Sequence, residues 1–254
     1  MSVRNLQMDP QSGEHTLRSA DYRDRLVDWE SRAASGGDFL ERLLHRQDVR
    51  SVADVACGTG VTALGLARSG LTVTAADGSP HMVAKTREAA DEQGVALADA
   101  RVADWMRLDR DLGANRFDAV VCLGDAFSHL FESEARRDAV EAFYRTVRPG
   151  GLLILDHRNY DALLESGTGS RPYQSGQDVE AWPTALNRYL TRFEYRFRDG
   201  ARFQRSMYPL RQDYVSHLLE DAGFVDVERF GDFQRPYNRL AARLIQQVGR
   251  KPRG

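Results

Sequence analysis

Apolar and polar residues along the chain form short blocks with two different spacings. Runs of mostly apolar residues predict buried strands, because a strand covered on both faces has no polar side. These runs lie at 52–56, 71–75, 95–102, 117–123 and 152–155. Between them, apolar residues recur at helical spacing at 61–67, 82–93 and 132–147. Strands that alternate with helices predict an α/β fold with a doubly wound, mostly parallel sheet.

The pattern changes on both sides of this region. Residues 21–45 read as two helices separated by Gly36 and Gly37. After residue 163, glycines mark loops, and alternation at 188–197 and 202–208 around Asp199-Gly200 predicts an antiparallel ribbon. A helix at 212–221 and strands at 224–230 and 239–248 then complete a seven-stranded sheet.

This pattern predicts three parts. A helical segment, 1–48, lies over the active site. The main domain consists of 49–162 and 207–254. A small antiparallel insertion after the fifth strand, 163–206, forms a lid-like subdomain.

A tight glycine turn separates the first strand from the first helix. Gly58 and Gly60 have no Cβ, so the backbone can turn sharply and approach a ligand closely. Asp77 ends the next strand, where its carboxylate can accept both hydroxyls of an adenosine ribose. This unit predicts a nucleotide-like ligand. The alternative is an ordinary strand–helix–strand turn in which Asp77 caps the helix that follows.

The glycines do not identify the nucleotide. The pattern Gly58-x-Gly60-x-x-Ala63 also fits nicotinamide dinucleotides. Two features favour S-adenosylmethionine. Asp54, near the strand tip, suits the cationic amino-acid end of that ligand, and Asp104-Trp105 suits the adenine amine and one face of its ring.

Composition narrows the classes of partner. The 254 residues carry 35 Lys and Arg against 37 Asp and Glu, which gives no electrostatic footprint for nucleic acid. Two cysteines are too few for a disulfide framework, and no apolar run approaches the ~20 residues of a membrane span. Residues 1–20 are polar and show no signal peptide. We expect a soluble, cytoplasmic protein that binds neither nucleic acid nor membrane.

All the loops singled out follow predicted strands. They are 57–60, 77–79, 104–105, 124–129 and 156–160. Ligands of such sheets bind beyond the carboxyl ends of the strands. These loops therefore predict a single site.

Several motifs together resemble one family. They are Ala-Cys-Gly-Thr-Gly at 56–60, Cys-Leu-Gly-Asp-Ala-Phe-Ser-His-Leu at 122–130, Val-Arg-Pro-Gly-Gly-Leu-Leu-Ile-Leu-Asp-His-Arg-Asn-Tyr-Asp at 147–161, Met-Tyr-Pro at 207–209 and Gly-Asp-Phe at 231–233. With them the chain resembles class I S-adenosylmethionine-dependent methyltransferases, which are Rossmann-like, and among these glycine N-methyltransferase and its bacterial glycine/sarcosine relatives. The resemblance covers most of residues 21–248.

The resemblance and the glycine-turn pattern imply a cofactor site for S-adenosylmethionine, with S-adenosylhomocysteine as product and no metal. The residues expected to line it are Arg32, Asp54, Ala56, Gly58, Gly60, Asp77, Gly78, Ser79, Met82, Asp104, Trp105, Leu123 and His129.

The resemblance also implies a substrate site. Arg158 takes the position that grips a substrate carboxylate, its catalytic partners are Asp125 and Tyr208, and Gly124, Tyr173 and Tyr195 complete the site. Alternatively, Arg158 pairs with Asp156 or Asp161, His129 caps the following helix, and Tyr173 and Tyr195 are core. His157 is expected to be a core histidine or a support for the site rather than a base.

One position departs from the family, which carries asparagine where this chain has Asp125. A carboxylate there favours a cation or several hydroxyls over a substrate carboxylate. Asp125 is also the best candidate to accept or relay the proton of an incoming ammonium.

We therefore predict N-methylation of a small polar amine, first an amino sugar or its phosphate or nucleotide derivative, as in antibiotic biosynthesis. Glycine or sarcosine is the alternative acceptor. A nicotinamide-dependent oxidoreductase and a non-catalytic binding subunit are the rivals from other classes. A homo-oligomer is possible. The acceptor and the number of methyl groups transferred stay open.

Overall fold

The structure is a computed structural model, and it describes residues 37–167, 173–176, 178–234 and 237–253. Its main sheet has seven strands in the order β10-β11-β5-β4-β1-β2-β3. Their bounds are β1 Ser51–Asp54, β2 Thr72–Asp77, β3 Asp99–Val102, β4 Phe117–Cys122, β5 Val147–Arg158, β10 Val225–Gly231 and β11 Leu244–Arg250. The pairs among β1 to β5 are parallel, and β11 runs antiparallel to both β5 and β10. The predicted doubly wound sheet is confirmed.

Helices cover both faces of this sheet. One apolar cluster packs α3 (Asp38–Arg46), α4 (Val61–Arg68) and α5 (Pro80–Glu92) on one face. A second cluster on the other face contains residues of α6 (Leu108–Leu112), α7 (Ser133–Thr146) and α9 (Gln212–Asp221). The helices predicted at 82–93, 132–147 and 212–221 are thus confirmed. Of the two predicted over 21–45, the second is α3, and residues 21–36 lie outside the described part of the chain.

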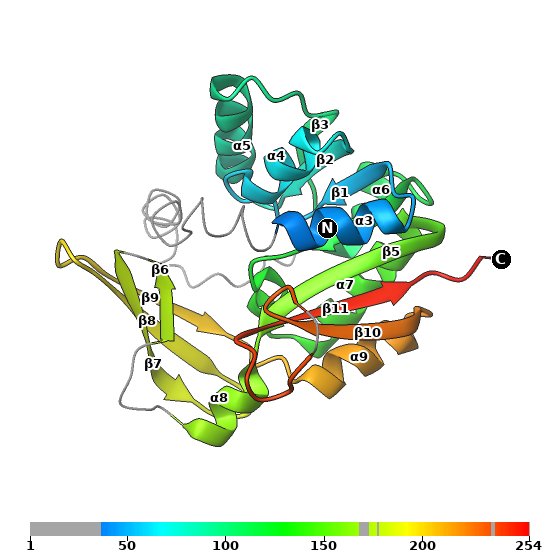
Figure 1. Cartoon of the computed structure of the whole chain (residues 1–254). Coiled ribbons are helices and arrows are strands. Elements are labelled where there is room, and N and C mark those ends of the chain that lie inside the picture. Colours follow the sequence, from blue (N-terminus) through cyan, green and yellow to red (C-terminus); the bar gives the residue numbers. More distant parts are fainter. Residues whose placement is uncertain (1–36, 168–172, 177, 235–236, 254) are drawn as a thin grey trace, which may run out of the picture.

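The insertion is larger than the ribbon that was predicted. It begins with α8 (Tyr160–Ser166) and forms a second, antiparallel sheet in the order β6-β7-β8-β9. The strands are β6 Tyr173–Gly176, β7 Val179–Leu186, β8 Thr191–Phe197 and β9 Arg202–Met207. Figure 1 shows this sheet beside the main one, next to α8. The predicted ribbon is β8 and β9, whereas β6, β7 and α8 were not predicted.

Three predicted strands have clearly different bounds in the structure. The fifth, predicted at 152–155, runs over Val147–Arg158. The third is only Asp99–Val102. The last begins at Leu244 rather than 239, because the Asn238 side chain accepts hydrogen bonds from the backbone N–H groups of Leu240 and Ala241. An asparagine that caps its own backbone in this way favours a turn over a strand. No helix among the described residues has the length and apolar character needed to cross a membrane.

Candidate active site

The glycine turn and Asp77 meet at the carboxyl ends of β1 and β2. Gly58 and Gly60 have φ angles of 56° and 95°, which glycine adopts without strain. Asp77 Oδ2 accepts from Gly58 N at 3.0 Å, and Oδ1 accepts from Ser79 N at 2.9 Å. The residue that caps α5 is Ser79, whose Oγ accepts from Met82 N at 3.4 Å. The alternative in which Asp77 caps the helix is therefore wrong, and its carboxylate instead lies against the glycine turn.

The neighbouring strand ends bring an aromatic side chain and two more acids to the same edge. The Trp105 indole donates to Val55 O at 2.6 Å, which fixes the ring beside β1. Asp104 Oδ1 accepts from Met106 N at 3.1 Å and is half-buried. Asp54 is buried at the end of β1, where Oδ1 accepts from Ala56 N at 3.3 Å. Close-approach glycines, a carboxylate and an aromatic ring fit an adenosine-containing cofactor.

The other predicted cofactor residues differ in how far they are exposed to solvent. Met82 and Leu123 are buried, Ala56 is half-buried, and Gly78 and His129 are exposed. His129 ends a short 3-10 helix, η3 (Ala126–His129). It does not cap α7, whose N-cap residue is Glu132. The prediction for Arg32 lies outside the described residues.

Asp125 and Arg158 form a buried ion pair at the ends of β4 and β5. Arg158 Nε lies 3.1 Å from Asp125 Oδ2, and the backbone N–H of Arg158 donates to Oδ1 at 3.2 Å. Tyr160 donates to Oδ2 at 2.8 Å. The loop before the pair is held by Asp156, whose Oδ1 accepts from Asp125 N at 2.7 Å. The alternative in which Arg158 pairs with Asp156 or Asp161 is therefore wrong, and the carboxylate it pairs with is Asp125.

Aromatic side chains from the second sheet enclose the Arg158 guanidinium. Nη2 donates to the Tyr195 hydroxyl at 2.7 Å. The guanidinium carbon lies 4.3 Å from the Phe193 ring centroid and 5.0 Å from that of Tyr173. Within the described part of the chain, the buried Nη1 atom has no hydrogen-bond partner. Tyr173 and Tyr195 are thus brought to Arg158, so they are not merely core of the insertion.

These surroundings define the charge state of each group. Burial lowers the pKa of Arg158, but Tyr195 and Asp125 outweigh it and hold the pKa above its ordinary value. Burial and the neighbouring Asp125 charge raise the pKa of Tyr160, and burial raises that of Tyr173 to about 12. At neutral pH the site therefore presents a permanent cation beside these two neutral phenols.

Tyr208, just after β9, joins the same loop through its backbone. Its N–H donates to Ser128 O at 2.7 Å, and Ser128 Oγ donates to Asp125 O at 2.6 Å. The centroid of the Tyr208 ring lies 3.8 Å from the guanidinium carbon of the buried Arg136. Gly124, with a φ of 84°, lets the loop turn just before Asp125. The backbone of Tyr208 is therefore tied to the loop that carries Asp125.

Two residues at this site were not among the predicted ones. Tyr160 lies inside the Asp-His-Arg-Asn-Tyr motif, but its partner Asp125 is 35 residues away. Phe193 shares the strand periodicity of Tyr195, so both side chains point to one face of β8. That alternation is the signal from which Phe193 could have been found.

The chain is similar in sequence to a known family and to characterised proteins. The family described as "Methyltransferase domain" matches residues 52–151. Over 240 residues the chain is 42% identical to the glycine/sarcosine N-methyltransferase of Parasynechococcus marenigrum (strain WH8102), covering 93% of this chain and 84% of that protein.

Solved structures share the fold. An S-adenosylmethionine-dependent methyltransferase from Clostridium acetobutylicum ATCC 824 has a TM-score of 0.72 at 18% identity, covering 94% of this chain and 100% of that one. An amino pentose methyltransferase from Micromonospora echinaspora, solved with S-adenosylmethionine bound, has a TM-score of 0.63 at 24% identity, covering 92% and 96%. At these identities the likeness concerns the fold alone.

Proposed function

The chain belongs to the S-adenosylmethionine-dependent methyltransferases, in the family of the glycine/sarcosine N-methyltransferases, and from this premise we propose that it methylates the nitrogen of glycine and of sarcosine. S-adenosylmethionine is the methyl donor. The family assignment sets aside the nicotinamide-dependent oxidoreductase and the non-catalytic binding subunit.

The observation that carries the proposed acceptor is the buried Nη1 atom of Arg158. Asp125 and Tyr195 engage Nε and Nη2 of the same guanidinium, while Nη1 has no partner among the described residues. A buried donor without a partner is costly, by about 1–3 kcal/mol. A substrate carboxylate supplies the missing acceptor, and with it a charge-assisted hydrogen bond.

The position of Asp125 favours glycine over an amino sugar. An amino sugar came first among the acceptors expected from the sequence, because a free carboxylate would attract an ammonium or several hydroxyls. In the structure that carboxylate is paired with Arg158 and accepts from Tyr160, so both of its oxygens are engaged within the protein, whereas Nη1 of Arg158 is not. The glycine alternative is therefore better supported than the amino-sugar prediction, and a role in antibiotic biosynthesis is not supported.

Each residue of the site then has a proposed role in methyl transfer. S-adenosylmethionine supplies an electrophilic methyl group. Asp77, the glycine turn and Trp105 hold its nucleoside, Arg158 holds the substrate carboxylate, and Tyr173, Tyr195 and Tyr208 line the acceptor side. Fixing the nitrogen in line with the methyl group contributes roughly 7–11 kcal/mol at the favourable limit. We assign Asp125 a positioning role, because the contacts of its carboxylate are with Arg158 and Tyr160, which it holds in place.

The test compares acceptors that differ only in the carboxylate. Initial rates are measured with glycine, sarcosine and glycinamide, which keeps the amine and replaces the carboxylate by an amide. We expect methylation of glycine and sarcosine, with kcat/KM for glycinamide lower by about 100-fold or more. Equal rates for glycine and glycinamide would show that Arg158 does not bind a substrate carboxylate.

A further inference from the structure

Arg158 lies between two buried polar residues, His157 and Asn159. His157 is fully buried, and its Nδ1 lies 2.8 Å from the backbone carbonyl of Arg158. A carbonyl oxygen only accepts, so Nδ1 carries the hydrogen and Nε2 is left as an acceptor. Burial lowers the pKa of His157, which agrees with this neutral ring. The imidazole lies on the other face of β5 from the Arg158 side chain and holds the Arg158 peptide through its carbonyl.

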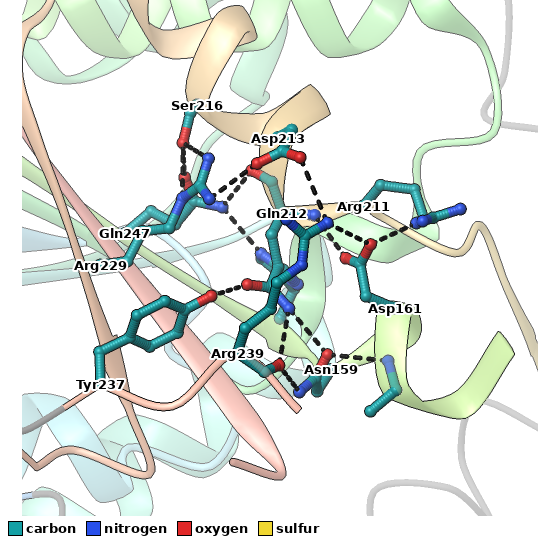
Figure 2. Close-up of polar contacts among 12 residues, drawn as sticks. Asn159, Asp161, Arg211, Gln212, Asp213, Ser216, Arg229, Tyr237, Arg239 and Gln247 are labelled. Atoms are coloured by element: carbon teal, nitrogen blue, oxygen red, sulfur yellow. Dashed lines mark hydrogen bonds and ion pairs between the residues drawn. The ribbon is translucent and has the colours of Figure 1, made fainter. Parts of the chain in front are cut away.

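The acceptor on His157 is filled by a glutamine of the neighbouring strand. Gln247 Nε2 lies 3.0 Å from His157 Nε2 and donates also to Gln212 O at 2.9 Å. Gln247 Oε1 accepts from the Ser216 hydroxyl at 2.7 Å. Figure 2 shows Gln247 between Ser216 of α9 and Gln212. Every hydrogen-bonding atom of this buried side chain is used, and its two donors can be satisfied in only one orientation of the amide.

The chain of contacts continues to the protein surface. Ser216 Oγ accepts from Arg229 at 3.0 Å and 2.7 Å, and Arg229 lies 2.7 Å from Asp213 (Figure 2). The direction of each hydrogen bond is thus set from Arg229 inward to the Arg158 carbonyl. When buried hydrogen bonds are linked in this way, each one fixes the orientation of the next, and the network keeps a single arrangement.

The same network holds the residue after Arg158. Asn159 Oδ1 accepts from Gln212 Nε2 at 2.9 Å, and its Nδ2 donates to Arg239 O at 2.6 Å and to Ala242 O at 2.8 Å (Figure 2). Gln212 contacts Gln247 through its backbone oxygen and Asn159 through its side chain. The backbone is therefore held on both sides of Arg158.

We propose that Gln247 is a positioning residue of the methyl-transfer site, which fixes the His157 ring and through it the Arg158 peptide. The inference rests on the proposed function, because Arg158 is the group proposed to hold the substrate carboxylate. Gln247 acts on the Arg158 backbone through the His157 ring and, by way of Gln212, through Asn159. Its loss therefore affects substrate capture rather than the cofactor.

The chain provides a matched control on the same strand. Gln246 is as fully buried as Gln247, but strand alternation places its side chain on the opposite face. There its Oε1 accepts from the backbone N–H of Phe233 at 2.8 Å. Gln246→Met removes a buried hydrogen bond of β11 and leaves the contact between Gln247 and His157 in place.

The experiment compares full-length wild type, Gln247→Met and Gln246→Met. Methionine keeps the length of glutamine and removes its donors. For Gln247→Met we expect the KM for glycine to rise about tenfold, which corresponds to about 1.4 kcal/mol, with kcat and the KM for S-adenosylmethionine within about twofold of wild type. For Gln246→Met we expect the KM for glycine to stay within about twofold of wild type. An equal rise in both variants, or none in Gln247→Met, would overturn the inference.

A second readout does not depend on the acceptor. Nitrogen-15 spectra of the histidine rings report the tautomer, and a His157→Gln variant assigns the signal. We expect the Nδ1–H form in all three proteins, because the Arg158 carbonyl fixes it, and a shifted resonance of the unprotonated Nε2 in Gln247→Met alone, because that variant removes the hydrogen bond to Nε2. A His157 signal unchanged by Gln247→Met overturns the inference. If wild type methylates neither glycine nor sarcosine while the signal still depends on Gln247, the proposed function fails and the hold of Gln247 on His157 stands.

Discussion

At the scale of single residues, Arg158 is held by three kinds of contact. An ion pair with Asp125, a hydrogen bond to Tyr195 and the face of Phe193 restrict the guanidinium. A side chain ordered in this way loses little further freedom when a ligand binds, which favours affinity. The positions of Arg158 and Asp125 after strand ends were predictable from their motifs. Their pairing was not, because it depends on how two loops 33 residues apart approach each other.

Arg158→Lys tests the role of the planar guanidinium. Lysine keeps the charge but cannot reproduce the fork that contacts Asp125, Tyr195 and a carboxylate at once. We expect the KM for glycine to rise about tenfold or more, since a charge-assisted hydrogen bond contributes about 1.5–3 kcal/mol. Calorimetry with S-adenosylmethionine serves as the control and should show unchanged affinity. An unchanged KM for glycine would rule out the carboxylate contact.

Asp77→Ala tests the cofactor side. The Asp77 carboxylate lies at the glycine turn, where we propose that it accepts the ribose hydroxyls. We expect the affinity for S-adenosylmethionine, measured by calorimetry, to fall about tenfold or more, from the loss of charge-assisted hydrogen bonds. The thermal unfolding midpoint separates a local loss from unfolding. Wild-type affinity in a folded variant would refute the ribose role.

At the scale of elements, predictability depended on how each element is buried. The strands of the main sheet are covered on both faces and read as apolar runs. The second sheet was only half predicted, because β7 contains Pro183 and has just two buried apolar residues, Val179 and Ala181. The seven-residue α8 has no apolar periodicity, and the Asn159 side chain caps it by accepting from Ala162 N at 3.1 Å.

The connection between α8 and α9 makes a pH-dependent contribution to stability. Burial raises the pKa of Asp161, but the N–H of Gln212 and the Arg211 side chain outweigh it and leave the pKa below its usual value. The unfolded state, with a pKa of about 3.9, then binds more protons than the folded state. The contribution is present above about pH 4 and is lost as the pH falls through the folded value.

Asp161→Asn checks this sign. We expect the variant to unfold at lower urea concentration than wild type near neutral pH, and the difference to shrink as the pH falls below about 4. Urea midpoints measured at several pH values provide the comparison. A difference that stays constant down to about pH 2 would contradict the assignment.

At the scale of the whole molecule, the two sheets share one apolar core. The cluster that contains Leu153 and Leu155 of the main sheet also contains Val179, Phe193 and Met207 of the insertion. The insertion is therefore expected to unfold together with the main domain. A second sheet that packs on Arg158 also makes the acceptor site depend on this shared core.

Phe193→Ala tests that coupling. Phe193 is fully buried, so truncation should lower the free energy of unfolding by about 3–5 kcal/mol. We expect a single urea transition in wild type and in the variant, with the variant's midpoint at lower urea concentration. In each protein the transitions followed by near-ultraviolet and by far-ultraviolet circular dichroism should coincide. Separate transitions for the two signals would show that the insertion unfolds alone.

The most direct measurement is a competition assay with the purified protein, S-adenosylmethionine carrying a deuterated methyl group, and equal concentrations of glycine, sarcosine and a free amino sugar, with the labelled products identified by mass spectrometry. The account predicts methylated glycine and sarcosine as the main products, because Arg158 selects a carboxylate and the Asp125 charge is already paired. An N-methylated amino sugar as the main product would contradict it.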